Sequence, residues 1–237
     1  MYIVSEAHQD SQNEIVRIQS AVIERFEAHI LDRAFPCVGA KSALARNHIQ
    51  YLVAGDIRCP RDDRAVFSAL VDYARAYSAA PGPFQSFVVL YQTRDTLDEA
   101  AFEAAMWARL QALETMDAAA GHAYDRRVSP NVDSPEFSLS FAGEAFFVVG
   151  LHPGASRPAR RFDTPALVFN AHDQFEALRA GGRYEGLRDS IIARDVAVAG
   201  SANPMLARHG ERSEAVQYSG RATEDDWVCP FRRVHAD

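Results

Sequence analysis

The segments Ala145-Phe-Phe-Val-Val-Gly-Leu151 and Pro165-Ala-Leu-Val-Phe169 decide the fold. Each is a short apolar run, rich in aromatic and β-branched residues and bounded by polar or turn-forming residues, which is typical of a buried strand. Just before the first, Phe137-Ser-Leu-Ser-Phe141 alternates apolar and polar residues and ends at Ala142-Gly143. This pattern predicts a hairpin, so we expect one sheet with an antiparallel part.

Helical periodicity and turn signals fill most of the remaining chain up to about residue 200. We expect helices over residues 11–31, 40–47, 62–77, 96–119, 170–179 and 184–194, and further strands at 51–54 and 84–92. Thr96 and Asn170 are the expected caps of two of these helices. The predicted fold class is α+β, with a mixed-sheet α/β fold as the alternative, as a single domain over residues 1–237. Its core is a four- to five-stranded sheet covered by helices.

Composition and charge narrow the class of protein. Hydrophobic residues make up 48% and charged residues 24%, as in ordinary globular proteins, and the net charge is −7. An acidic chain argues against nucleic acid as partner, and no apolar run is long enough for a membrane span. Three cysteines, Cys37, Cys59 and Cys229, form no Cys-x-x-Cys pair, so we expect no disulfide framework and a cytoplasmic location.

Two histidines directly follow predicted strands. His152 precedes Pro-Gly, and its imidazole could ligate iron, act as an acid or base, or simply make a turn hydrogen bond. His172 and Glu176 are four residues apart in a helical stretch, which suits metal ligation as well as an ordinary solvated helix face. Because both histidines stand at the C-terminal ends of strands, we expect them near a common ligand site.

Three arginines lie between these two motifs. Arg157, Arg160 and Arg161 occupy a proline-containing loop, and fixed guanidinium groups suit bidentate binding of carboxylate or phosphate. Ion pairs with the excess of acidic side chains are the alternative. Glycine-rich nucleotide-binding loops are absent from the sequence.

Several motifs together carry a resemblance to a known family, and they are Phe35-Pro-Cys-Val-Gly-Ala40, His152-Pro-Gly-Ala-Ser-Arg-Pro-Ala-Arg-Arg-Phe162, Phe169-Asn-Ala-His-Asp-Gln-Phe-Glu-Ala-Leu-Arg179, Gly200-Ser-Ala-Asn-Pro-Met-Leu206 and Ser213-Glu-Ala-Val-Gln-Tyr-Ser-Gly-Arg221. Over about residues 30–231 the chain resembles the YqcI/YcgG family. Characterised members include haem-dependent N-oxygenases, such as the guanitoxin pre-toxin N-hydroxylase and arginine N-hydroxylases. The chain departs from the family pattern at Ala171 and at Gly154-Ala155, and neither change removes a candidate ligand.

The resemblance implies a haem b cofactor, dioxygen and an external electron donor. It makes His152 the first choice for the axial iron ligand and His172 the second, with the thiols of Cys37 and Cys229 ranked lower. Propionate partners would be Arg157, Arg160 and Arg161, and aromatic candidates near the pocket are Phe146, Phe147, Phe162 and Phe169.

The implied activity is hydroxylation of an amino or guanidino nitrogen of a small, cationic, amino-acid-like substrate. Carboxylates that could hold the cation are Glu176, Glu214 and Asp195. A redox partner or reductant is expected, and a homodimer is left open. Two alternatives remain: a non-haem iron oxygenase that uses His152, His172 and Glu176, and a non-catalytic haem carrier or sensor.

Overall fold

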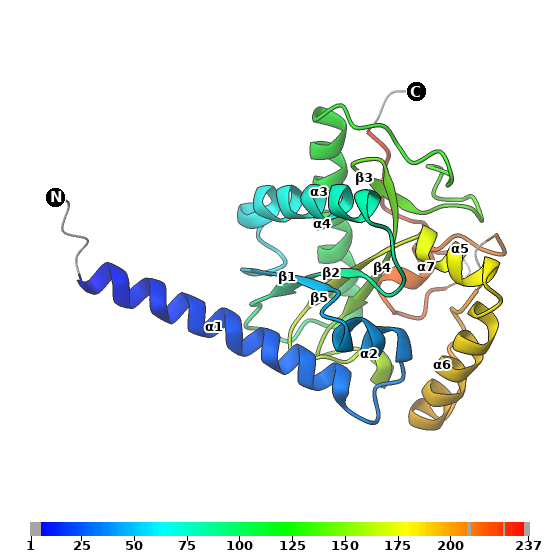
Figure 1. Ribbon diagram of the computed structural model, residues 1–237, viewed down its shortest axis with the longest axis horizontal. Coiled ribbons are helices and arrows are strands. Elements are labelled where there is room, and N and C mark those ends of the chain that lie inside the picture. The colour runs from blue at the N-terminus through cyan, green and yellow to red at the C-terminus, as the bar shows by residue number, and fades with distance from the viewer. Residues whose placement is uncertain (1–5, 208–209, 225, 235–237) are drawn as a thin grey trace.

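A five-stranded mixed sheet runs through the middle of the molecule (Figure 1). The computed structural model describes residues 6–207, 210–224 and 226–234. The strands are β1 (Ile49–Ala54), β2 (Ser86–Tyr91), β3 (Leu139–Phe141), β4 (Glu144–Leu151) and β5 (Ala166–Ala171), in the order β1-β2-β5-β4-β3. The β1–β2 pair is parallel and the other pairs are antiparallel. The predicted mixed sheet with its antiparallel hairpin is confirmed.

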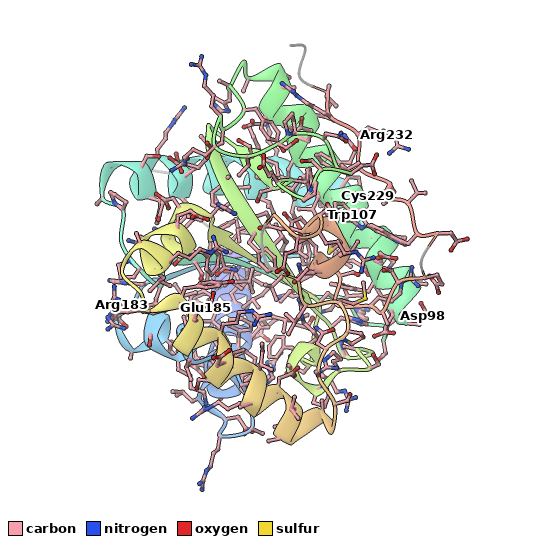
Figure 2. The ribbon with its side chains drawn as sticks, turned by 90° about the vertical axis from the view of Figure 1, so that its right-hand side faces the viewer. Asp98, Trp107, Arg183, Glu185, Cys229 and Arg232 are labelled. Atoms are coloured by element: carbon pink, nitrogen blue, oxygen red, sulfur yellow. The ribbon has the colours of Figure 1, made fainter. Side chains whose placement is uncertain are left out.

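Helices α3 (Asp63–Ala79) and α4 (Glu99–Ala119) cover one face of this sheet (Figure 1). Phe87, Phe146 and Phe169 project from the strands into this layer and are at most 2% exposed. The layer also takes in the short helix α7 (Ala215–Tyr218) and the segment around Cys229, which lies beside Trp107 of α4 (Figure 2). We call this side the packed face.

The opposite face is covered by α1 (Glu6–Leu31), α2 (Val38–Ala45), α5 (Asp173–Ala180), α6 (Tyr184–Ala199) and the short 3-10 helix η2 (Pro158–Arg160). We call it the cavity face. Helix α1 contributes Val22, Phe26 and Ile30 to its core, whereas its earlier part projects beyond the body (Figure 1). Figure 2 shows Arg183 and Glu185, where α6 begins, on the opposite side of the view from Asp98, which precedes α4.

The two predicted helix caps, Thr96 and Asn170, are both wrong. Asp98 caps α4, because its side chain accepts a hydrogen bond from the N–H of Ala101 at 2.7 Å, and Thr96 does not take this role. Strand β5 continues through Asn170, so α5 begins later, at Asp173. The 3-10 helix η1 (Pro60–Asp62), η2 and α7 were not expected, because short turns lack a readable period.

None of the helices in the described part of the chain combines the length and the apolar character needed to cross a lipid bilayer.

Candidate functional site

A cavity of about 300 Å³ lies on the cavity face, between the sheet and the helices that cover it. This volume is within the range of small-molecule and cofactor sites. Most of its wall is apolar, formed by strand residues Val88, Phe147, Val149 and Val168 and by helix residues Phe26, Ile30, Leu178, Leu187, Ile191 and Ile192. The wall therefore favours a largely apolar occupant.

Cys37 is one of the residues that line this wall. The residue is the N-cap of α2, and its sulfur accepts a hydrogen bond from the N–H of Ala40 at 3.4 Å. Burial raises the pKa of the thiol, while the N–H groups of Ala40 and Gly39 and the charge of Arg160 act in the opposite direction. The side chain is thus held by the first turn of α2, in a residue that lines the cavity.

Three polar side chains of the wall, those of Ser86, Asn170 and Gln174, are engaged with each other or with the main chain. Ser86 donates a hydrogen bond to Asn170 Oδ1 at 2.8 Å, and Asn170 Nδ2 donates to the carbonyl of Phe147 at 3.3 Å. Gln174 is bonded through both of its amide atoms to the main chain of Gln85, at 3.1 Å each. These groups hold β2, β4, β5 and α5 together at the cavity.

Asp195 of α6 is different, because only one of its carboxylate oxygens is engaged. Its Oδ2 accepts a hydrogen bond from Arg157, whose guanidinium also donates to the carbonyl of Ser201 at 3.0 Å. Asp195 is 6% exposed and lines the cavity, and its Oδ1 has no partner among the residues that the structure describes. Among the described residues that line the cavity, Asp195 Oδ1 is the one buried side-chain polar atom without a hydrogen-bond partner.

Arg160 contributes a second guanidinium to the same end of the cavity. It donates to the main-chain carbonyls of Gly150, Tyr218 and Gln217 at 2.9–3.2 Å. Burial lowers its pKa to about 10, and the charges acting on it include those of Asp195, Arg157 and Cys37. Arg160 therefore binds main-chain carbonyls of three residues and lies close to Asp195, Arg157 and Cys37.

His152 does not line this cavity. It is 1% exposed and stacks on Phe102 of the packed face, with the ring centroids 4.2 Å apart. Burial lowers the pKa of its imidazole, against the opposing effect of Leu97 and of the nearby carboxylates of Glu99 and Asp98. His152 is thus a buried ring that packs on an aromatic side chain of the core.

The expectation that His152 and His172 share one site is wrong, because β4 and β5 are antiparallel. Leu151 pairs with Ala166 and Phe146 pairs with Ala171. The C-terminal end of β4 therefore lies beside the N-terminal end of β5, and the two C-terminal ends point in opposite directions. A strand rises by about 3.4 Å per residue, and the two histidines flank opposite ends of the paired strands. They are therefore separated by more than about 20 Å.

His172 and Glu176 also do not come together. The His172 Nε2 atom lies 3.3 Å from Glu214 Oε1 in a buried pair, whereas Glu176 is exposed and pairs with Arg179. Within the described residues there is no group of three or more His, Cys, Asp or Glu side chains that could hold a metal ion. The proposed facial triad of His152, His172 and Glu176 is therefore contradicted.

The remaining candidates divide between the two faces of the sheet. Phe147 lines the cavity and also contacts Tyr218, with ring centroids 5.5 Å apart, whereas Phe146 and Phe169 belong to the packed face. Phe162 packs against Phe26, with ring centroids 5.1 Å apart, behind the cavity wall. The exposed Arg161 closes its own loop through hydrogen bonds to the carbonyls of Ala155 and Ser156.

The sequence reading did not single out Ser86, Gln174 or Asn203, which also line the cavity. No sequence motif identifies these residues, because isolated polar residues beside apolar ones are common. Asp195 had a usable signal: it continues the helical spacing of Leu187 and Ile191, so it falls on the inward face of α6.

Comparison with known proteins gives one result. Residues 26–232 match the YqcI/YcgG family, and this range covers all five strands, α2 to α7 and every cavity residue named above. Neither the curated proteins nor the solved structures include a match. Because the match extends over most of the sequence, the chain belongs to the YqcI/YcgG family.

Proposed function

We propose that this protein is a haem-dependent monooxygenase that hydroxylates an amino or guanidino nitrogen of a small substrate. The observation that carries the proposal is the composition of the cavity wall. A cysteine, Cys37, and a buried aspartate, Asp195, are among the residues that line an otherwise largely apolar cavity. One suits an iron ligand, and the other suits a substrate nitrogen.

The donor set fits a haem held through sulfur. Cysteine thiolate is an established axial ligand of haem iron and favours cleavage of the O–O bond. Cys37 lines the cavity, and its hydrogen bond from Ala40 would orient the sulfur, as outer-shell partners of metal ligands do. We therefore place the iron ligand at Cys37 and not at His152 or His172, which lie outside the cavity wall.

The propionate groups of a haem would need cations. Arg157 and Arg160 line the cavity, but both also hold protein acceptors. Their role would be to offset the propionate charge at this end of the cavity. Arg161 does not line the cavity, so it is left out of the proposed cofactor site.

When bound, a haem of this kind supplies reductive activation of dioxygen. Overall, one oxygen atom forms a bond to the substrate nitrogen in place of a hydrogen, and the other leaves as water. The balance requires two electrons and two protons from an external donor for each R–NH₂ converted to R–NHOH.

The chain's own residues would prepare the site for this reaction. The apolar walls from β2, β4, β5 and α6 would exclude water and accept the carbon skeleton of the substrate. The bonded pair Ser86 and Asn170 would fix the floor of the cavity. Asp195 would hold the substrate nitrogen.

The test begins with protein produced under a generous haem supply. We expect a Soret band in the wild-type protein and a ferrous carbonyl spectrum typical of thiolate ligation, with both lost in Cys37→Ser. His152→Ala and His172→Ala, provided that they fold, should retain the Soret position. Retention of the same spectrum by Cys37→Ser would rule out the ligand assignment.

A second measurement separates an oxygenase from a haem carrier. The haem-loaded protein, supplied with a reductant and a library of amines and guanidines, should produce compounds that gain one oxygen atom by mass spectrometry. Haem binding without any such product would favour a carrier or sensor.

A further inference from the structure

Tyr218 of α7 places a phenol group in the core of the packed face. The residue is 0% exposed, and its hydroxyl oxygen lies 3.3 Å from Glu214 Oε2 and 3.3 Å from the carbonyl oxygen of Phe146. The other carboxylate oxygen of Glu214 lies 3.3 Å from His172 Nε2. Burying a phenol, a carboxylate and an imidazole together costs free energy that a phenylalanine at position 218 would avoid. Packing alone therefore does not account for this group.

Aromatic contacts connect Tyr218 to the surface. Its ring centroid lies 5.8 Å from that of Trp107, which stands beside the segment around Cys229 (Figure 2). The Trp107 ring lies in turn 6.4 Å from the ring of Trp227. Both distances are those of aromatic rings in contact. Trp107 is buried, whereas Trp227 is half-buried, so the series reaches the surface at Trp227.

In the other direction, Tyr218 contacts residues that line the cavity. The ring of Phe147, a lining residue of β4, lies 5.5 Å from the Tyr218 ring. Arg160, which also lines the cavity, donates a hydrogen bond to the main-chain carbonyl of Tyr218 at 3.2 Å. Tyr218 is thus separated from the cavity by one layer of side chains.

Phenol and indole rings lose a single electron far more readily than the ring of phenylalanine. Loss of an electron makes the phenol of Tyr218 a strong acid, and the carboxylate of Glu214 is within reach of its proton. The indole Nε1 of Trp107 has no hydrogen-bond partner in the described structure. An oxidised Trp107 would therefore keep its proton and be restored by the gain of one electron.

We propose that Tyr218, Trp107 and Trp227 form an electron-transfer chain between the cavity wall and the surface, with Glu214 as the proton acceptor of Tyr218. When a one-electron oxidant forms in the cavity, Tyr218 gives it one electron, and the phenolic O–H bond breaks as the proton moves to Glu214. An electron then arrives through Trp227 and Trp107 from a one-electron reductant in solution, such as ascorbate, and the proton returns to Tyr218. The chain would remove oxidising equivalents that no substrate consumes.

This inference goes beyond the proposed function, and only the identity of the oxidant in the cavity rests on that function. A haem that activates dioxygen without a bound substrate would supply such an oxidant. The path through the three aromatic side chains belongs to the protein itself, so it can be measured without haem.

Pulse radiolysis of the full chain, produced without added haem, tests the path in the reverse direction. Azide radicals oxidise indole in preference to phenol at neutral pH, so the first product should be an indolyl radical at the half-buried Trp227. Tyr218 should then reduce this radical through Trp107. The expected signal is decay of the indolyl absorption with a matching rise of tyrosyl absorption, at a rate independent of protein concentration.

Variants identify the donor and the relay. Tyr218→Phe and Trp107→Phe, which both keep an aromatic ring in the core, should abolish the matching rise. Tyr73→Phe is the matched control, because Tyr73 is also buried in the packed face and its hydroxyl has no hydrogen-bond partner in the described structure. It should leave the rate unaltered. Absence of intramolecular transfer in the wild-type protein, which requires no variant to fold, overturns the proposal, as does unchanged transfer in Tyr218→Phe or Trp107→Phe.

The role of Glu214 is read from proton movement. Transfer in the wild-type protein should be slower in D₂O, because the O–H bond of Tyr218 breaks. Glu214→Gln should slow the transfer, whereas Glu176→Gln, the same exchange at an exposed carboxylate, should not. An equal rate in the wild type and Glu214→Gln would remove Glu214 as the proton acceptor.

Failure of this inference is distinguishable from failure of the proposed function. Radical transfer reports on Tyr218 and Trp107, whereas the Soret band reports on haem binding at Cys37. A protein that binds haem and shows no transfer retains the oxygenase proposal and loses the electron-transfer chain, and the opposite result does the reverse.

Discussion

The two faces of the sheet carry side chains of the same strands and have opposite characters. On the packed face, Phe146 and Phe169 interlock with α3 and α4. On the cavity face, the alternate positions hold smaller or polar groups such as Val168 and Asn170, and a cavity remains above them. Stability and ligand binding are thus assigned to opposite sides of one sheet, and β4 and β5 belong to both.

The largest expected effect compares one phenylalanine from each face. Phe169→Ala should lower the free energy of unfolding by about 3–5 kcal/mol, because it leaves a void in a filled core. Phe147→Ala should cost less than about 3 kcal/mol, because its ring already borders a cavity. Urea unfolding of both variants measures the difference, and equal losses would remove the distinction between the faces.

Replacing a valine by a larger side chain should also destabilise the packed face more than the cavity face. Val148→Phe overfills the packed face and should cost about 1–3 kcal/mol in unfolding free energy. Val168→Phe extends into the cavity, so it should cost less than about 1 kcal/mol while it reduces haem and amine binding. Unfolding and ligand titration of each variant decide this point. An equally destabilised Val168→Phe would show that the cavity is not free space.

Two glycines provide a smaller test. A Cβ at Gly154 would lie 2.3 Å from the carbonyl oxygen of Leu97, so Gly154→Ala should destabilise the protein by about 1–2 kcal/mol. In α6, a Cβ at Gly186 would meet nothing within 4 Å, and Gly186→Ala should stabilise by up to about 1 kcal/mol. Thermal denaturation compares them. A neutral Gly154→Ala would show that the loop after β4 can shift away from Leu97.

The smallest effect is a pH dependence that arises from the packed face. The pKa of His152 is lowered by burial, so the folded state binds fewer protons than the unfolded state below the ordinary histidine pKa of about 6.5. Stability is therefore complete above that pH and declines as the pH falls toward the folded-state pKa. His152→Phe keeps an aromatic ring on Phe102 and should flatten this decline.

Part of the acid slope should persist in that variant, because burial also lowers the pKa of His29. Unfolding free energies measured between pH 7.5 and 5 provide the comparison. An unchanged slope in His152→Phe would mean that the imidazole of His152 does not remain neutral in the folded protein.

The sequence predicted the elements better than their mutual arrangement. The apolar runs at 145–151 and 165–169 identify strands, and the hairpin follows from the turn at Ala142-Gly143, because these signals are local. The direction of β5 relative to β4 is not local, since the loop between them permits either direction. His152 and His172 were therefore expected together, and antiparallel pairing separates them.

The candidate site was predicted in part. The motif Phe35-Pro36-Cys37 contributes to the cavity wall, as do Arg157 and Arg160 from the loop after β4. What the sequence did not provide was the ranking of the cysteine against the histidines. That ranking depends on which face of the sheet each side chain joins, and loop residues have no periodicity from which the face can be read.

Part of helix α1 does not contribute to the hydrophobic core. From Asn13 to Ala21 its side chains are largely exposed, including Ile15, Val16 and Ile18, and burial begins at Val22. The matched family range starts at residue 26, close to this transition. The outer turns of α1 can therefore be trimmed, tagged or exchanged without touching the sheet, which makes this arm the natural attachment point for probes that must leave the cavity undisturbed.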